Sequence, residues 1–347
     1  MKPNIIFFFL FLAILFLAYL SSCHHPKKVT TSFYYWKTVY KANKTEAAYL
    51  QYFKVHKLYV RIMDVDMGEN GVDPVPVSPV IFKDKLPDSV QIVPVVFIVN
   101  DILKNITKPK LNDLVNKIPF FVNGKVQQAG KHSFNELQID CDWTATTRDN
   151  YFYLLNRLKL NPALKGKTIS ATLRLHQLKN QSGSGVPPVS RAMLMCYNMG
   201  NLRKYGNKNS ILEISELKKY LGSNISAYPM PVDIGLPLFS WVVAFRNKEY
   251  IGISKRTKIV DLHNKNQFIF IGNNIYKAAR DLPEFGLNKA DEVRWEAVAV
   301  PDLQAASRYL STLIKTDTIN VIYFHLDETV IKPYAYTDLE KVNDLLH

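Results

Sequence analysis

The feature that most constrains the fold is a repeated alternation between strand-like and helix-like segments. Runs rich in Val, Ile, Tyr and Phe favour strands, and helix-like or Pro- and Gly-rich stretches separate them. The strand interiors are nearly continuously apolar, as in strands covered on both faces. The pattern therefore predicts an α/β protein in which eight parallel strands close into a (β/α)8 TIM barrel. The eight segments are 32–40, 57–66, 90–99, 136–143, 167–178, 191–199, 232–245 and 319–327.

The domain organisation follows from where this alternation is interrupted. Between the seventh and eighth strands, at about 246–294, short strand-like runs surround a Leu-Pro turn, which predicts a small α+β insertion. We expect the barrel to occupy 32–335 and a C-terminal helix or tail to occupy 336–347. The segment 181–188 is interpreted as a loop, since barrel strands continue beyond it.

The N-terminus has the pattern of an export signal. Lys2 precedes an uncharged apolar stretch, Ile5 to Leu20, that is too short for a comfortable membrane span. The sequence Leu20-Ser-Ser-Cys23 resembles the bacterial lipobox, in which the Cys thiol is lipidated. We therefore expect a lipoprotein signal peptide at 1–22, lipidation at Cys23 and a tether at 23–31. An uncleaved anchor helix is the alternative, and both tether the chain to a membrane. The predicted location is the bacterial cell envelope, lipid-anchored and facing the periplasm or the exterior.

Charge and cysteine usage exclude some classes of protein. The formal net charge is +14, but no run of five basic residues occurs, so we expect no nucleic-acid partner. Beside Cys23 only Cys141 and Cys196 occur, which excludes a disulfide framework and favours buried structural cysteines. No HExxH, GxxxxGK[ST] or GxSxG motif is present. We expect no cofactor, no metal and a monomer.

Polar residues cluster where strands end, at the face on which barrel active sites are built. The strongest signal is Asp140 and Asp142, because period-2 alternation turns both side chains toward the barrel mouth. Two buried carboxylates repel, so either one pKa rises or a hydrogen-bond donor is recruited. The alternative is that they hold loops or backbone. The other candidates at strand ends are Asp64, Asp66, His176, Asn198 and Asp327.

These residues carry a resemblance to a known family. Asp140-x-Asp142-Trp143 resembles the DxxDxDxE motif of the chitinase-like glycoside hydrolase family 18, and Tyr197-Asn198 sits where that family has M-x-Y-D. Gly235-Leu-Pro-Leu-Phe239 is similar to its seventh-strand segment, and many members carry an insertion at the same place. The chain also resembles a set of uncharacterised bacterial lipoproteins with hydrolase-like barrels.

Departures from the family pattern bear on catalysis. Thr144 stands where the family has its general-acid Glu, Leu137 replaces the first Asp, and Asn198 replaces another. The resemblance implies that Asp142 orients an N-acetyl group and that Tyr197 supports a cyclised intermediate, a scheme that still needs the acid. Asp140, Asp142 and Tyr197 are therefore the candidate catalytic residues. Other carboxylates that could replace the acid are Asp64, Asp66, Asp327 and Glu328.

Aromatic and basic residues complete the predicted site. Trp36, Trp143 and Trp241 lie in or at the ends of strands, where flat rings can stack on sugars, although barrels also use such rings as packing. Arg174 and His176 share one face of the fifth strand, where they would bind an acidic sugar or neutralise the aspartates.

Three functions remain open from the sequence. The chain is a membrane-anchored barrel that binds a glycan or oligosaccharide without the family's acid catalysis, a glycosidase with relocated carboxylates, or a structural or protein-binding component of the envelope. A second carboxylate within reach of Asp142 would distinguish them.

Overall fold

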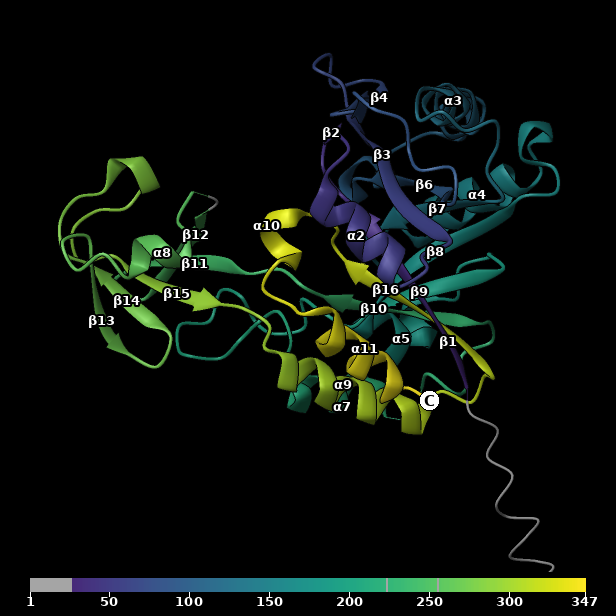
Figure 1. The fold of residues 1–347 in the computed structure, drawn as a ribbon. Coiled ribbons are helices and arrows are strands. Elements are labelled where there is room, and N and C mark those ends of the chain that lie inside the picture. The colour runs from purple at the N-terminus through teal and green to yellow at the C-terminus, as the bar shows by residue number, and fades with distance from the viewer. Residues whose placement is uncertain (1–26, 223, 255) are drawn as a thin grey trace, which may run out of the picture.

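The computed structural model describes residues 27–222, 224–254 and 256–347. Its eight parallel strands form a closed barrel, which confirms the predicted TIM-barrel fold (Figure 1). Around the barrel the order is β1, β3, β6, β7, β8, β9, β10, β16, and β16 pairs with β1 to close it. The strands are β1 (Lys28–Tyr35), β3 (Lys57–Met67), β6 (Gln91–Ile98), β7 (Glu136–Cys141), β8 (Thr168–Arg174), β9 (Arg191–Met195), β10 (Val232–Pro237) and β16 (Thr318–Phe324). The expected signal peptide and Cys23 lie outside the described residues.

Helices cover the outside of the barrel. The longer helices bury apolar side chains, as α4 does with Tyr151, Leu154, Leu155 and Leu158, whose spacing is that of one helix face. The helices are α2 (Lys44–Tyr52), α3 (Lys108–Gln128), α4 (Arg148–Lys159), α5 (Leu175–Lys179), α6 (Gln181–Ser184), α7 (Ile214–Leu221), α9 (Val300–Leu313), α10 (Glu328–Ile331) and α11 (Tyr336–Asp344). Single 3-10 turns are η1 (Asn100–Leu103) and η2 (Pro162–Leu164).

Strand alternation also fills the barrel interior. The even-numbered residues of β7 point inward, and at the N-terminal end of the barrel Glu136 accepts hydrogen bonds from Lys57 Nζ at 2.9 Å and Ser170 Oγ at 2.8 Å. Arg191 and Asp233 form an ion pair of 2.6 Å at the same end. Buried charges are stable only when they are paired and hydrogen-bonded, so these contacts stabilise the N-terminal end of the barrel, which we call its closed end. Glu136 therefore lies away from the mouth.

The insertion forms an antiparallel sheet with a small core of its own. Figure 1 shows it as a separate lobe that leaves the barrel after β10. The sequence predicted one strand over 232–245, but β10 ends at Pro237 and β11 begins at Trp241, because the chain passes here from the barrel into the insertion. In sheet order its strands are β12 (Glu249–Ser254), β11 (Trp241–Arg246), β15 (Glu292–Glu296), β14 (Ile275–Ala278) and β13 (Phe268–Gly272). It also holds α8 (Ile259–Leu262) and η3 (Pro283–Phe285).

Several short elements were not predicted. The fifth strand ends at Arg174, and His176 belongs to α5, so these two residues do not share a strand face as expected. The loop after β3 returns as β4 (Pro74–Val77), antiparallel to β3, and β2 (Val39–Tyr40) pairs with β5 (Ile81–Phe82). Such strands are too short for a periodic signal.

The cysteines and the surface complete the description. Cys141 and Cys196 are free and buried, as expected of structural cysteines, and burial raises the pKa of both thiols.

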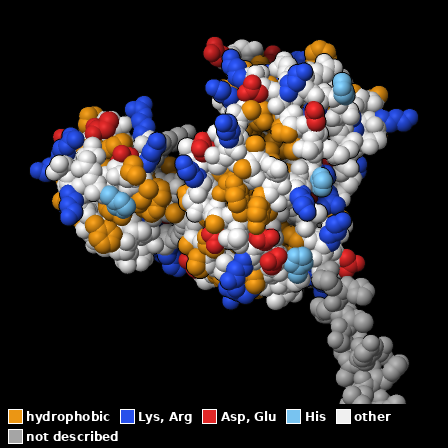
Figure 2. All heavy atoms as spheres, in the orientation of Figure 1, with side chains coloured by type: hydrophobic (Ala, Val, Ile, Leu, Met, Phe, Trp, Pro, Cys, Tyr) orange, Lys and Arg blue, Asp and Glu red, His pale blue; other side chains and the backbone are white. Residues whose placement is uncertain are grey.

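Figure 2 shows Lys and Arg side chains scattered over the visible face of both lobes. In the described part of the chain no helix is long and apolar enough to cross a membrane.

Candidate functional site

A cavity of about 260 Å³ opens at the carboxyl ends of the barrel strands; we call it the mouth cavity. Residues of β1, β3, β6, β7, β8, β9 and β16, or directly after these strands, line it. They are Tyr34, Trp36, Asp64, Phe97, Asp140, Asp142, Thr172, Arg174, Met193, Met195, Tyr197, Asn198 and Phe324. The structure thus brings together seven of the predicted site residues at the face where barrel sites are built.

A second cavity, of about 270 Å³, adjoins the first; we call it the side cavity. The two share Asp142, Arg174, Tyr197 and Asn198, so they lie side by side, and we call them together the cleft. His176 lines the side cavity from α5, although it is not on the strand. Its pKa is lowered by burial and by the neighbouring Arg174 charge, which favours the neutral imidazole.

Asp142 and Arg174 form a bidentate ion pair across the cleft. Arg174 Nε lies 2.5 Å from Asp142 Oδ1, and Arg174 Nη2 lies 2.5 Å from Asp142 Oδ2. Two parallel charge-assisted hydrogen bonds fix both side chains. Arg174 therefore neutralises Asp142, which was one of its two predicted roles.

Asp140 lies deeper, and its environment differs. Its side chain is only 5% exposed and accepts a hydrogen bond of 2.5 Å from Thr172 Oγ1. Burial, followed by repulsion from Asp142, raises the pKa of Asp140 to about 7. The two neighbouring carboxyls thus differ, since the half-exposed Asp142 recruits an arginine and the buried Asp140 holds its proton more strongly.

The remaining candidate aspartates separate into different places. Asp64 lines the mouth cavity, and Arg61 holds it with a 2.7 Å bond from Nε and a second bond from Nη2. Asp66 lies outside both cavities, where Oδ1 accepts from the backbone of Met67 at 2.7 Å. Asp327 caps α10 and pairs with Lys37 at 3.5 Å. Neither Asp66 nor Asp327 lines the cleft, so their expected roles in binding are corrected.

The aromatic side chains form a row that begins in the mouth cavity. The centroid distances are 5.5 Å from Trp36 to Phe324, 5.6 Å from Phe324 to Phe239, and 5.2 Å from Phe239 to Trp241. All four rings are half-buried, and we call them the aromatic row. Trp241 lies outside both cavities, at the far end of the row on β11, and its Nε1 donates to Glu296 at 3.0 Å.

Trp143 is the clearest correction to the predicted site. Only 1% of it is exposed; it stacks on Tyr151 at 5.0 Å and donates from Nε1 to the Ser184 carbonyl at 2.9 Å. The alternation that turns Asp142 into the barrel turns its neighbours toward the helices. The ring is core packing and is not accessible to a ligand.

Tyr197 and Asn198 follow β9 and line both cavities. Burial raises the pKa of Tyr197, so its hydroxyl stays protonated. Asn198 has a φ of 54°, a left-handed conformation that Asn tolerates better than most residues, and its backbone N–H donates to the Ile211 carbonyl at 2.8 Å. This bend directs the chain into the loop beside the side cavity.

Thr144 lies outside both cavities. It is exposed, and its hydroxyl lies 2.9 Å from that of Thr146. Among the described residues, Asp64, Asp140 and Asp142 are the carboxylates that line the cleft. The described chain holds no group of three His, Cys, Asp or Glu arranged to bind a metal ion.

Several lining residues escaped sequence reasoning. Thr172 precedes Arg174 by two positions on β8, so alternation would have placed it in the mouth. Phe97 and Phe324 are apolar residues near strand ends and look like core in a sequence. Arg61 reaches Asp64 across a bulge in β3, which no sequence signal marks.

Comparison with known proteins supports the fold. No known family matches the sequence, and no curated protein matches it significantly. Solved structures are similar at low sequence identity, and their likeness shows that this chain has the same barrel fold as a spore cortex-lytic enzyme and a chitinase. The resemblance to chitinase-like barrels is therefore confirmed for the fold, whereas the grouping with bacterial lipoproteins stays a prediction.

Three of these structures show how similar the solved structures are to this chain. The spore cortex-lytic enzyme SleL of Bacillus cereus has a TM-score of 0.54 and 13% identity, over 92% of this chain and 75% of that one. A chitinase from Chromobacterium violaceum has a TM-score of 0.53 and 11% identity, over 90% and 98%. A mutant of catalytic domain 2 of the group II chitinase of Ostrinia furnacalis, in complex with penta-N-acetylchitooctaose, has a TM-score of 0.53 and 11% identity, over 92% and 96%.

Proposed function

We propose that this chain is a lipid-anchored envelope protein whose barrel mouth binds a glycan without hydrolysing it. The fold is that of chitinase-like barrels, one of which is in complex with a chito-oligosaccharide. Fold alone does not establish function, so the proposal rests on the chemistry of the cleft.

The cleft has the two kinds of surface that a sugar needs. Trp36 and Phe324 are half-buried rings in the mouth cavity, and flat rings stack on the C–H faces of pyranoses. Asn198 and the Asp142–Arg174 pair supply polar groups in the same cavity, and His176 supplies one in the adjoining side cavity. An oligosaccharide lying along the aromatic row would place its hydroxyls within reach of these groups.

The state of the three carboxylates carries the second half of the proposal. Asp64 accepts hydrogen bonds from Arg61, and Asp142 accepts them from Arg174. Asp140 is buried and accepts a hydrogen bond from Thr172. Glycoside hydrolysis requires one carboxyl to protonate the leaving oxygen and another group to stabilise or attack the sugar. Since Thr144 cannot donate that proton at the family position, we propose binding without cleavage.

The anchor is proposed from Leu20 to Cys23, because these residues lie outside the described structure. β1 begins at Lys28, at the end of the barrel opposite the mouth. A short tether from a lipidated Cys23 would therefore hold the closed end of the barrel near the membrane. This arrangement supports a cleft that faces away from the membrane.

The test is calorimetric titration with chitohexaose and with glycans selected on an array, accompanied by chromatography of the products. We expect wild-type binding, loss of about tenfold in affinity for Trp36→Ala, and no new sugar fragments. Phe120→Ala is the control, because that ring is 83% exposed on α3, away from the cleft. Absence of any bound glycan, or equal affinity in the Trp36 variant, would reject the proposal.

One observation favours the alternative that the protein is a glycosidase. With a pKa of about 7, Asp140 carries a proton in a large fraction of molecules at neutral pH, as a general acid must. The same product analysis distinguishes the two functions. Cleavage that declines above pH 7 and is abolished by Asp140→Asn would establish Asp140 as a relocated acid.

A further inference from the structure

A third cavity, of about 520 Å³, lies beside the cleft; we call it the outer cavity. It shares Met199 and Tyr220 with the side cavity, so it adjoins that cavity, as the side cavity adjoins the mouth cavity. The chain 199–210 after β9 and residues of α7 form its walls. None of the predicted site residues lies in it.

The outer cavity carries an excess of positive charge. Three lysines and two glutamates line it, and Lys219 pairs with Glu216 at 3.4 Å. Glu213 is engaged at the start of α7, where it accepts from Ser215 Oγ at 3.1 Å. In the described chain neither Lys204 nor Lys208 has a carboxylate within ion-pair distance. Two ammonium groups are thus available to a ligand.

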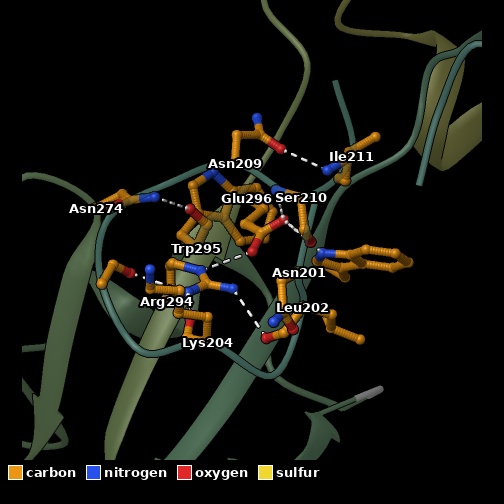
Figure 3. A network of polar contacts seen from close by, with 12 residues as sticks. Asn201, Leu202, Lys204, Asn209, Ser210, Ile211, Asn274, Arg294, Trp295 and Glu296 are labelled. Atoms are coloured by element: carbon orange, nitrogen blue, oxygen red, sulfur yellow. Dashed lines mark hydrogen bonds and ion pairs between the residues drawn. The ribbon is translucent and has the colours of Figure 1, made fainter. Parts of the chain in front are cut away.

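The insertion holds the wall that carries these lysines. Arg294 on β15 is 1% exposed and donates to the carbonyls of Leu202, Lys204 and Gly206 at 3.1, 2.8 and 2.9 Å (Figure 3). Glu296 holds Arg294 Nε at 2.6 Å and the Ser210 backbone N–H at 2.7 Å. A buried arginine with hydrogen bonds from all three of its guanidinium nitrogens fixes the loop before any ligand arrives, which reduces the entropic cost of binding.

Among the described residues that line the mouth and side cavities, none is an unpaired cation. Arg174 was one candidate to bind an acidic sugar, but its charge is already paired with Asp142, which accepts two hydrogen bonds from it. Burial also lowers the pKa of His176, which leaves that ring neutral. In the outer cavity, by contrast, Lys204 and Lys208 are unpaired cations that a negatively charged group on the ligand can reach.

We propose that the outer cavity binds a carboxylate carried by the glycan whose sugar chain occupies the mouth. Lys204 and Lys208 bind this group, and Arg294 is a positioning residue that holds their loop. The preferred ligand is then an acidic glycan, with its charged substituent a short distance along the chain from the sugar in the mouth. This inference rests on the proposed function, because it specifies the substrate class of the same cleft.

The probes are chitohexaose and 6-O-carboxymethylated chitohexaose, which differ in their carboxylates. At low salt we expect wild type to bind the carboxymethylated form about three- to tenfold more tightly, with the difference shrinking as salt screens it. The variant Lys204→Gln/Lys208→Gln should lose this preference and keep its affinity for chitohexaose. Lys159→Gln/Lys165→Gln is the control with the same loss of charge, because those exposed lysines lie at the opposite end of the barrel.

Arg294→Lys tests the positioning role, since lysine keeps the charge but not the fork of donors that holds three carbonyls. It should reduce the preference for the carboxymethylated probe and leave chitohexaose binding unchanged, a split that general destabilisation would not produce. Equal affinity of wild type for both probes, or a preference that survives Lys204→Gln/Lys208→Gln, overturns the inference while the proposed function stands. Failure of both probes and of every array glycan to bind overturns the proposed function itself.

Discussion

Asp140 gives a quantitative test of the cleft, through the effect of pH on stability. Its pKa rises from 3.8 to about 7 on folding, so between these values the native state binds the proton more strongly than the unfolded chain does. Stability from this group is complete below pH 4 and is lost as the pH rises toward and through 7. A tenfold change in an equilibrium constant is about 1.4 kcal/mol, so the loss between pH 5 and pH 8 amounts to about 2–3 kcal/mol.

The perturbation is Asp140→Asn, which keeps an acceptor for Thr172 but cannot ionise. Urea unfolding of wild type and variant at pH 5, 6, 7 and 8 measures the difference in free energy of unfolding at each pH. We expect the variant to gain about 2–3 kcal/mol relative to wild type between pH 5 and pH 8. Comparison at each pH cancels other titrating groups such as Asp233, whose pKa burial raises to about 6.

The control is Asp88→Asn, because Asp88 is exposed on the surface. Its free energy of unfolding should follow that of wild type at every pH. If the Asp140→Asn and wild-type values also run parallel from pH 5 to pH 8, Asp140 is not the buried, proton-retaining group that the geometry describes.

Three further predictions concern individual residues. Trp143→Ala should lower stability by about 3–5 kcal/mol in urea unfolding, as expected for a buried aromatic ring, whereas Trp36→Ala should cost much less; similar losses for both would contradict their assigned environments. Thr144→Glu should create no hydrolysis of chitohexaose, because position 144 lies outside both cavities, and released sugars in a product assay would show otherwise. Growth with a labelled fatty acid should label wild type and leave Cys23→Ala unlabelled, while an unlabelled wild type would reject the lipobox interpretation.

The barrel was predictable because its signal is repeated along the chain. Eight apolar strand-like runs alternate with helices, and parallel strands need such crossovers, so few other folds fit the pattern. The switch from β10 to β11 was missed, since 232–245 is mostly apolar on both sides of Pro237 and its single charged residue, Asp233, lies at the start of β10 and not at the bend. The short β4 and α5 were missed because each spans too few residues for its hydrophobic periodicity to be recognised in the sequence.

The parts of the site that could be predicted are those that depend on the alternation of side chains along a strand. That rule placed Asp140, Asp142 and Arg174 in one cleft, and applied consistently it would have removed Trp143 from the site. The rule left open whether Arg174 pairs with Asp142 or binds the ligand, and it did not reveal the Arg61–Asp64 bonds, which depend on a bulge in β3. The outer cavity depends on Arg294, more than eighty residues beyond the loop it holds.

The most direct test of the account is a crystal structure of the protein soaked with chitohexaose, or with the array glycan that binds most tightly. We expect density for sugar rings against Trp36 and Phe324, with polar contacts to Asn198 or Arg174 and with every glycosidic bond intact. Sugar bound elsewhere on the molecule, or a cleaved product in the mouth cavity, would contradict a barrel whose mouth binds a glycan without hydrolysing it.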